Sequence, residues 1–368
     1  MKVIISAGGT GGHIFPAIAV ADELKRQDPS VKILFVGAEG KMEMERVPKA
    51  GYAIEGLPIA GFQRRLSFQN IIKNLQLVYK LPLSMWRVRS IIKDFKPDVV
   101  VGFGGFASGP TLKAAASMGI PTVLQEQNSY AGVTNKLLAE KAVKICVAYD
   151  GLEKFFPKDK IIVTGNPVRS DIADIKSKKA EGIAHFGFDT NKKTIAVLGG
   201  SLGAKSLNMA MENNAQLIEN QLNVQILWQC GRLYEEDFKN GKSANLPNVK
   251  LQSFIDRMDL AYAAADVIIA RAGALTISEL CLAGTPSVLV PSPNVAEDHQ
   301  TKNAMSLVGK NAAVLVRDAD ASESMIQKAI ELLENQSLMQ NLSSNMLNLG
   351  KPNAAKDIAA EVKKAAMI

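Results

Sequence analysis

The chain contains 368 residues, of which 47% are hydrophobic, and it carries a formal net charge of +7 at pH 7. This length and composition are typical of a globular α/β protein with two domains that each bury a core. Three widely spaced cysteines argue against a disulfide framework or a CxxC metal site, and no apolar run approaches the roughly 18 residues of a membrane span.

The first predicted element is a buried strand over Lys2–Ser6, which leads through the glycine-rich turn Gly8–His13 into a helix over Ile14–Leu24. No signal peptide precedes this strand, so we expect a cytoplasmic protein. Glycine-turn amides and a helix N-terminus together predict an anion site, most naturally for phosphate. Ile14 occupies the third glycine position of GxGxxG, which argues against a nicotinamide fingerprint. A tight turn without a ligand is the alternative.

Two stretches of the chain occur twice, in the same order. Lys193–Gly203 repeats the pattern of Lys2–Gly12, and Asp266–Gly273 resembles Asp98–Gly105. In each half a small-residue helix and another apolar strand follow the second stretch. Such a repeat predicts two similar domains.

Residues 61–96 form a basic segment, with eight Lys or Arg residues and a single acidic residue, Asp94. Its apolar residues keep helical spacing, and we expect an interruption at Pro82. Basic residues beside aromatic and aliphatic ones suit an anionic membrane surface. The alternative is a core-facing helix whose charges are solvated. No RNP, zinc-finger or helix-turn-helix signature accompanies the charge, so nucleic acid is not expected.

Polar residues follow the predicted strands at the edge where open α/β sheets bind ligands. Asn128 lies just past the strand that ends before Gln125, and it is a candidate ligand contact or a turn former. Arg169 lies in the expected interdomain linker, from which it could reach an anionic ligand.

The second half contains two further turns between a strand and a helix. Gly199–Ser206 falls one residue short of a Walker A loop because Ala204 replaces a glycine. It can still bind phosphate through Ser201 and the Gly203 amide. In the second turn, Glu279 could accept the ribose hydroxyls of a nucleotide, or it is an ordinary helix carboxylate.

Three features remain after these turns. Asp298–Gln300 forms a loop suited to sugar hydroxyls, whereas Asp318–Asp320 is a DxD that we read as a helix N-cap or first turn and not as a metal site. The cysteines are read as buried or incidental thiols. Among the histidines, no functional role is expected for His185, while His13 and His299 fall in candidate site loops.

Taken together, these stretches resemble a family of bacterial GT-B glycosyltransferases. Members add N-acetylglucosamine to the lipid-linked muramyl-pentapeptide precursor of peptidoglycan, converting lipid I to lipid II. The resemblance covers nearly the whole chain and rests on the runs GGTGGHIFP, GFGGFASGP, EQNSYAGVTNK, GNPVR, GGSLGA, FIDRM, RAGALTISE and HQTKNA.

The resemblance implies two Rossmann-like, doubly wound parallel-sheet domains that face a cleft. Residues 1–164 would form an acceptor and membrane-facing domain, with 351–368 packing back on it, followed by a linker at 165–169 and a UDP-sugar domain at 170–350. The enzyme would act peripherally on the cytoplasmic face of the inner membrane, in cell-wall biogenesis, cell shape and division. It would need no metal and no cofactor.

The resemblance also implies a set of substrate-binding residues. Ser201 would contact the diphosphate, Ile255 the uracil through its backbone, and Glu279 the ribose. The residues implied to bind substrate are Thr10, Gly11, Gly12, Asn128, Arg169, Ser201, Ile255, Ala274, Leu275, Thr276, Ile277, Ser278, Glu279 and Gln300. Two positions depart from the family pattern: Gln125 stands where many relatives have His, and Leu202 where many have Gln.

The implied reaction is a direct displacement at the anomeric carbon by the muramyl hydroxyl, with inversion and departure of UDP. Helix N-termini and loop amides could stabilise the departing diphosphate without a metal. His13 is the candidate base, because the pKa range of histidine suits proton transfer near neutrality and the residue borders the phosphate turn. Alternatively, His13 orients the acceptor or caps the helix. A UDP-sugar 2-epimerase and a non-catalytic nucleotide-sugar binding protein are the competing functions.

Overall fold

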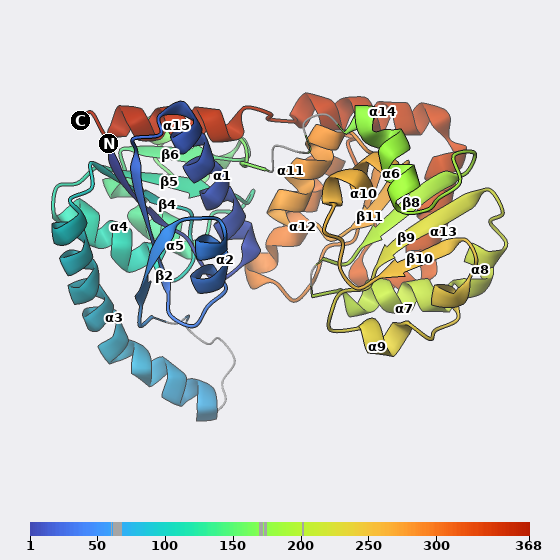
Figure 1. Cartoon of the computed structure of the whole chain (residues 1–368), viewed down its shortest axis with the longest axis horizontal. Helices are drawn as coiled ribbons and strands as arrows, with labels where there is room; N and C mark the ends of the chain where they lie inside the picture. Colours follow the sequence, from blue (N-terminus) through green and yellow to red (C-terminus); the bar gives the residue numbers. More distant parts are fainter. Residues whose placement is uncertain (60, 62–67, 169–171, 173–174, 201) are drawn as a thin grey trace. The chain divides into compact units, whose positions relative to one another are not determined.

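The computed structural model describes residues 1–59, 61, 68–168, 172, 175–200 and 202–368 (Figure 1). The chain divides into two compact units. The first unit comprises Met1–Val168 together with Asn353–Ile368, and the second comprises Arg169–Pro352.

The first unit is built on a seven-stranded parallel sheet with the order β3-β2-β1-β4-β5-β6-β7. Its strands are β1 (Lys2–Ser6), β2 (Lys32–Ala38), β3 (Ala53–Leu57), β4 (Val99–Gly102), β5 (Thr122–Glu126), β6 (Lys144–Val147) and β7 (Ile161–Val163). Its helices are α1 (Gly11–Gln27), α2 (Glu43–Lys49), α3 (Phe68–Phe95), α4 (Ser108–Ser117), α5 (Val133–Leu138) and α15 (Ala354–Ala365).

Both faces of this sheet are covered. Successive side chains of a strand point to opposite faces, so Val3 and Ile5 join the core beneath α1 and α15, whereas Ile4 joins the core beneath α3 and α4. The C-terminal helix α15 thus belongs to the first unit, where Ile358 and Val362 are fully buried.

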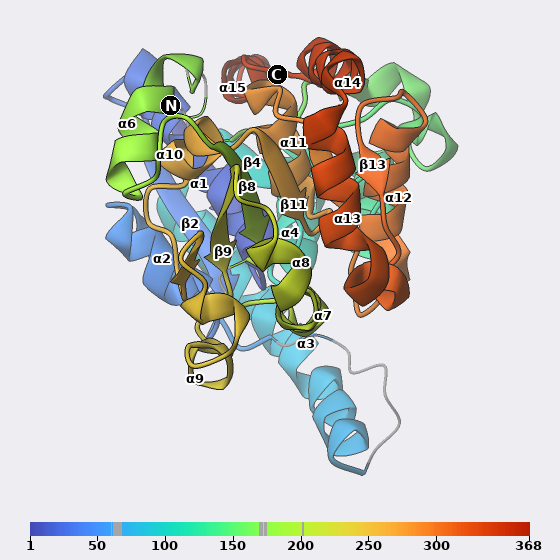
Figure 2. The same cartoon turned by 90° about the vertical axis from the view of Figure 1, so that its right-hand side faces the viewer.

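Helix α3 differs from the expected interrupted helix. It is continuous from Phe68 to Phe95 and contains Pro82, so the expected interruption is wrong. A proline removes only one backbone hydrogen bond, and the next turns are anchored because Val88 and Ile92 are buried in the core. Both views show the N-terminal half of α3 projecting away from the sheet of its unit (Figures 1 and 2).

The second unit is built on a six-stranded parallel sheet with the order β10-β9-β8-β11-β12-β13. Its strands are β8 (Lys193–Leu198), β9 (Val224–Gln229), β10 (Val249–Gln252), β11 (Val267–Ala270), β12 (Ser287–Leu289) and β13 (Val314–Leu315). Its helices are α6 (Lys179–His185), α7 (Lys205–Asn213), α8 (Ala215–Glu219), α9 (Glu235–Phe238), α10 (Met258–Ala264), α11 (Ala274–Ala283), α12 (His299–Val308), α13 (Ala321–Glu334) and α14 (Gln336–Leu349).

The sequence repeats occupy equivalent places in the two sheets. In each sheet the first strand of the unit is third from one edge, with the second and third strands on that side and the fourth on the other. The backbone N–H of Lys2 donates to Asp98 at the start of β4 (2.7 Å), and that of Thr194 donates to Asp266 at the start of β11 (2.9 Å). The predicted pair of doubly wound, parallel α/β domains is confirmed.

Candidate functional site

In the first unit, the turn after β1 lies directly against the turn after β4. Gly105 has a φ of +86°, and a Cβ atom there would lie 2.3 Å from the carbonyl oxygen of Gly8. Only glycine combines that backbone conformation with so close an approach. The two glycine-rich motifs therefore meet at the carboxyl ends of neighbouring strands, where open parallel sheets bind ligands.

A buried carboxylate holds the first turn in place. Glu43, at the start of α2, is fully buried, and its two oxygens accept the amides of Gly9 and Ala38, each at 3.0 Å. The amide of Gly9 is therefore engaged by the protein. Sequence reasoning missed Glu43, because a single glutamate in a polar loop carries no distinguishing pattern.

The amides that open α1 are the part of this turn that the anion-site prediction concerns. Thr10 occupies the N-cap in an extended conformation and is exposed, and Gly11 and Gly12 begin the helix. The first amides of a helix have no partner within the helix, and they carry the positive end of its dipole. The predicted substrate-binding residues Thr10, Gly11 and Gly12 thus lie together at one helix N-terminus.

His13 belongs to this first turn of α1 and is half-buried. Its Nδ1 lies 2.9 Å from Oε1 of Gln127, which follows β5. Gln127 is itself buried beside Gln125 and Asn166. The structure therefore brings the candidate base against the polar stretch at the end of β5, although 114 residues separate His13 from Gln127.

Asn128 makes the turn-forming contact that was one of its two expected roles. Its backbone amide and its Nδ2 both donate to Oε1 of Glu126, at 3.1 and 3.3 Å. The other oxygen of Glu126 accepts the amide of Gly132 and the side chain of Asn135, each at 2.9 Å. The buried Glu126 carboxylate thus shapes the loop after β5.

In the second unit, two turns again meet through glycine. A Cβ atom at Gly203, where φ is +87°, would lie 2.1 Å from the carbonyl oxygen of Cys230. Asn208 also donates to that oxygen from α7, at 2.8 Å. The turn after β8 is therefore fixed against the end of β9. Two predicted site residues, Ser201 and Arg169, lie outside the described residues.

The DxD stretch serves an internal network. Asp318 accepts hydrogen bonds from Arg271, which follows β11, and from Ser206 of α7, the latter at 2.6 Å. Asp320 stands at the N-cap of α13, but its carboxylate is ion-paired with Arg317 at 2.6 Å and makes no capping bond. The predicted N-cap position is therefore confirmed for Asp320, although its side chain pairs with Arg317 instead of the helix amides. Among the described residues, no cluster of three metal-ligating side chains occurs.

Helix α11 carries six of the predicted substrate-binding residues, from Ala274 to Glu279. Ala274, Leu275, Thr276 and Ser278 are half-buried, whereas Ile277 and Glu279 are buried. One Glu279 oxygen accepts the hydroxyl of Tyr262, a fully buried residue of α10, at 2.8 Å. Sequence reasoning missed Tyr262 because its helix reads as an ordinary apolar segment.

The remaining predicted contact in this unit, Gln300, lies at the start of α12. Its Oε1 accepts the backbone amide of Ser292 at 2.8 Å, which ties the helix to the loop after β12. His299 is the first residue of the same helix and is half-buried.

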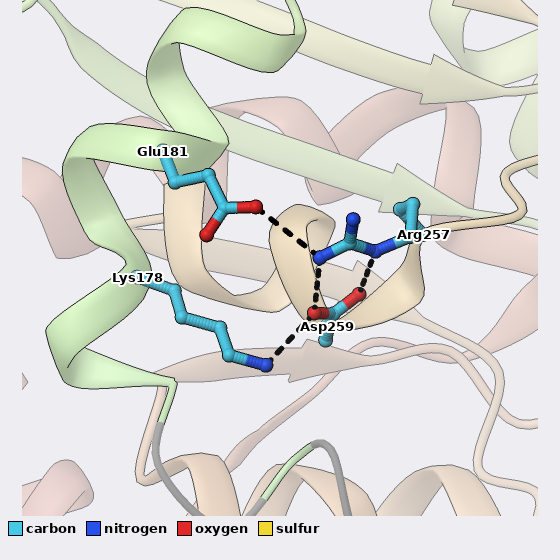
Figure 3. A network of polar contacts seen from close by, with 4 residues as sticks. All are labelled: Lys178, Glu181, Arg257 and Asp259. Atoms are coloured by element: carbon cyan, nitrogen blue, oxygen red, sulfur yellow. Dashed lines mark hydrogen bonds and ion pairs between the residues drawn. The ribbon is translucent and has the colours of Figure 1, made fainter.

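A network of four charged residues supports the segment after β10 (Figure 3). Arg257 donates from Nε and Nη2 to the two oxygens of Asp259, each at 2.9 Å, and also contacts Glu181 at 3.3 Å. Lys178 reaches the same carboxylate at 2.9 Å. The Arg257 guanidinium holds the pKa of Asp259 well below its usual range. The network fixes the segment that contains Ile255, whose side chain is buried.

The three cysteines are buried, as predicted. Burial raises the pKa of both Cys146 and Cys281 to about 12, and it also raises that of Cys230. A thiol with so high a pKa is rarely a thiolate, so these side chains act as packing residues.

Comparisons with known proteins agree with this architecture. The model of the glycosyltransferase family 28 N-terminal domain matches residues 3–147, and that of the glycosyltransferase family 28 C-terminal domain matches residues 194–362. A Bacteroides fragilis protein named UDP-N-acetylglucosamine--N-acetylmuramyl-(pentapeptide) pyrophosphoryl-undecaprenol N-acetylglucosamine transferase is 53% identical over 368 residues, which is 100% of this chain and 96% of that protein.

Solved structures give the same picture. The crystal structure of Acinetobacter baumannii MurG matches with a TM-score of 0.79 and 30% identity, over 99% of each chain. The UDP-GlcNAc 2-epimerase from Neisseria meningitidis, bound to UDP-GlcNAc, matches with a TM-score of 0.68 at 18% identity, over 99% of this chain and 100% of the other. At that identity the likeness to the epimerase concerns the fold alone.

Proposed function

The chain belongs to glycosyltransferase family 28, and we propose that it transfers N-acetylglucosamine from UDP-N-acetylglucosamine to lipid I, forming lipid II for peptidoglycan. The observation that carries this assignment is identity of 53% over all 368 residues to a transferase named for this donor and this acceptor. The acceptor is N-acetylmuramyl-(pentapeptide) pyrophosphoryl-undecaprenol.

The geometry of the first unit supports binding of the acceptor there. Thr10, Gly11 and Gly12 present a helix N-terminus that suits a diphosphate, and His13 stands one residue further along the helix. In the proposed step, His13 takes the proton from the acceptor hydroxyl while the oxygen of that hydroxyl attacks the anomeric carbon of the donor sugar. The bond from that carbon to the donor diphosphate breaks, and its electron pair leaves with UDP.

The second unit is proposed to bind the donor. Glu279 is buried and hydrogen-bonded to Tyr262, so its position is defined before a ribose arrives. The half-buried residues at the start of α11 place another helix N-terminus in the same unit. The donor contacts proposed in this unit are Arg169, Ser201, Ile255, Ala274, Leu275, Thr276, Ile277, Ser278, Glu279 and Gln300. Asn128 is a further proposed donor contact and belongs to the first unit.

A product assay tests this function against its competitors. The purified protein is incubated with UDP-N-acetylglucosamine, with and without a short-chain lipid I analogue. We expect a disaccharide-lipid and UDP only when the acceptor is present. A UDP-sugar epimer formed without acceptor would establish the 2-epimerase instead, and binding without any product would establish a non-catalytic protein.

We further propose that the first unit contacts the anionic cytoplasmic surface of the membrane peripherally through α3. Tyr79, Leu83 and Trp86 form an exposed stripe at helical spacing, and Trp86 is 69% exposed. Lys93 continues the stripe, and Arg89 lies beside it. An exposed apolar stripe beside Arg89 and Lys93, in a segment whose one acidic residue is Asp94, suits the interface of an anionic bilayer. Within the described residues, every helix is too short or too polar to cross a bilayer.

Vesicle flotation tests this contact. We expect the protein to float with anionic vesicles at low salt and to release as salt screens its charges. Trp86→Ser should weaken flotation, whereas Leu222→Ser, which removes another exposed hydrophobic side chain in the second unit, should not. Equal flotation of wild-type protein with neutral and anionic vesicles would contradict an electrostatic contribution.

A further inference from the structure

The side chains of Gln125, Gln127 and Asn166 form a closed circuit of hydrogen bonds next to His13, and the circuit is completed by the backbone carbonyl of Gln127. Asn166 donates from Nδ2 to the carbonyl oxygen of Gln127 at 2.9 Å, and Gln125 donates from Nε2 to Oδ1 of Asn166 at 3.0 Å. Gln127 in turn donates from Nε2 to Oε1 of Gln125 and to the carbonyl oxygen of Phe103, the latter at 2.9 Å. All three amide side chains are at most 2% exposed.

Two backbone carbonyls determine the direction of every bond in this circuit. A carbonyl oxygen can only accept, so the NH2 group of Asn166 must face the oxygen of Gln127, and its own Oδ1 must face Gln125. The same reasoning places the NH2 group of Gln127 against Phe103. The opposite orientation of Gln127 would place its own side-chain oxygen against three other oxygens in a buried site, which is costly.

The remaining atom of the Gln127 amide is Oε1, and it is the atom that faces His13. Because this oxygen is an acceptor, the Nδ1 atom 2.9 Å away must carry the hydrogen. A neutral imidazole has a single N–H group, so its lone pair then lies on Nε2.

We propose that Gln127 is a positioning residue that fixes neutral His13 as the Nδ1–H tautomer, which leaves Nε2 to receive the acceptor proton. Gln125 and Asn166 hold Gln127 in the orientation that this requires. The last step of this inference rests on the proposed function, whereas the tautomer is a property of the protein without substrate. Gln125 stands where many relatives have His, and in this chain its role would be to orient Gln127.

The tautomer can be measured directly. The sequence contains three histidines, so 15N NMR of histidine-labelled protein gives few ring signals, and His13→Ala assigns those of His13. At about pH 8.5, well above the ordinary histidine pKa of about 6.5, we expect the protonated-nitrogen shift at Nδ1 and the lone-pair shift at Nε2. Observation of the Nε2–H form in the wild-type protein would overturn the proposal, regardless of the turnover of any variant.

Gln127→Met tests the consequence for turnover. It keeps the length of the side chain and removes both hydrogen-bonding groups. We expect kcat to fall about tenfold or more, a decreased fraction of the Nδ1–H form, and a Kd for UDP-N-acetylglucosamine that changes less than about twofold.

Gln225→Met is the matched control. Gln225 is a buried glutamine of the second unit that donates to the Asp189 carbonyl and to Thr194, at 2.9 and 3.0 Å. A fall in kcat no larger for Gln127→Met than for this control would show that Gln127 contributes only packing, and would overturn the positioning role. If His13→Ala keeps full turnover while the wild-type protein shows the Nδ1–H tautomer, the base assignment fails but the tautomer assignment stands.

Discussion

Tyr262 donates its hydroxyl hydrogen to Glu279 across 2.8 Å, and both side chains are buried in the second unit. The bond joins α10 to α11 and orients the carboxylate that we assign to the ribose. Because ordering of Glu279 is complete before the ligand binds, less conformational entropy is lost on binding.

The first prediction concerns this pair. Glu279→Ala should raise the Kd for UDP about 10-fold to 100-fold, because a hydrogen bond to a charged group contributes about 1.5–3 kcal/mol. Tyr262→Phe should raise it only a few-fold, since the carboxylate remains but is less well oriented. Calorimetric titration with UDP measures both.

Tyr52→Phe provides the control for the tyrosine variant. Tyr52 donates to Asp22 at 2.6 Å in the first unit, so its loss removes a similar bond away from the proposed donor site. The Kd for UDP should not change. A loss of turnover in Glu279→Ala with unchanged UDP affinity would contradict the ribose assignment.

His13→Ala should lower turnover by about 10²-fold to 10⁴-fold, the usual range for an acid–base group. Binding of the donor should change little, because His13 is proposed to act on the acceptor. Steady-state kinetics with a short-chain lipid I analogue and titration with UDP-N-acetylglucosamine separate the two effects. His185→Ala, at an exposed histidine of α6, should retain full turnover. Retention of wild-type turnover by His13→Ala would remove the base assignment.

The Asp259 network predicts a dependence of stability on pH. Arg257, and after it Lys178, lowers the pKa of Asp259 below its ordinary value of 3.8 in the folded protein. A carboxylate with a lowered pKa stabilises the fold above its ordinary value, and this contribution declines as pH falls below it. The gap in free energy of unfolding between wild type and Asp259→Asn should therefore shrink from about pH 7 to about pH 2.5.

Urea denaturation at a series of pH values measures this gap. Asp256→Asn, at an exposed residue three positions earlier in the same segment, should leave the pH dependence of wild type unchanged. A gap that stays constant with pH for Asp259→Asn would show that the ion pairs contribute no pH-dependent stability.

The buried cysteines should be unreactive in the folded protein. Since burial raises the pKa of Cys146 and Cys281 to about 12, almost no thiolate is present near neutrality. An aromatic disulfide reagent at about pH 8 should label the native protein slowly and all three thiols after denaturation. Rapid labelling of the native protein would contradict the packing role.

Much of the fold follows from the sequence because its signals are local. Apolar runs mark the strands, glycine pairs mark the turns after them, and the repeated order of both predicts two similar parallel sheets. The bounds of the first strand, Lys2–Ser6, are those expected. The helix α3 continues through Pro82 against expectation, because the penalty for a proline is local whereas the contacts of Val88 and Ile92 that hold α3 are tertiary.

The chemistry of the site depends on contacts that no local pattern contains. Sequence identified His13 and Glu279 as candidates from their positions after glycine turns. It could not indicate that Gln127, 114 residues away, would orient the first, or that a tyrosine in an apolar helix would orient the second. Periodicity reports which face of an element is buried, but the partner of a buried polar atom is determined only when distant elements pack together.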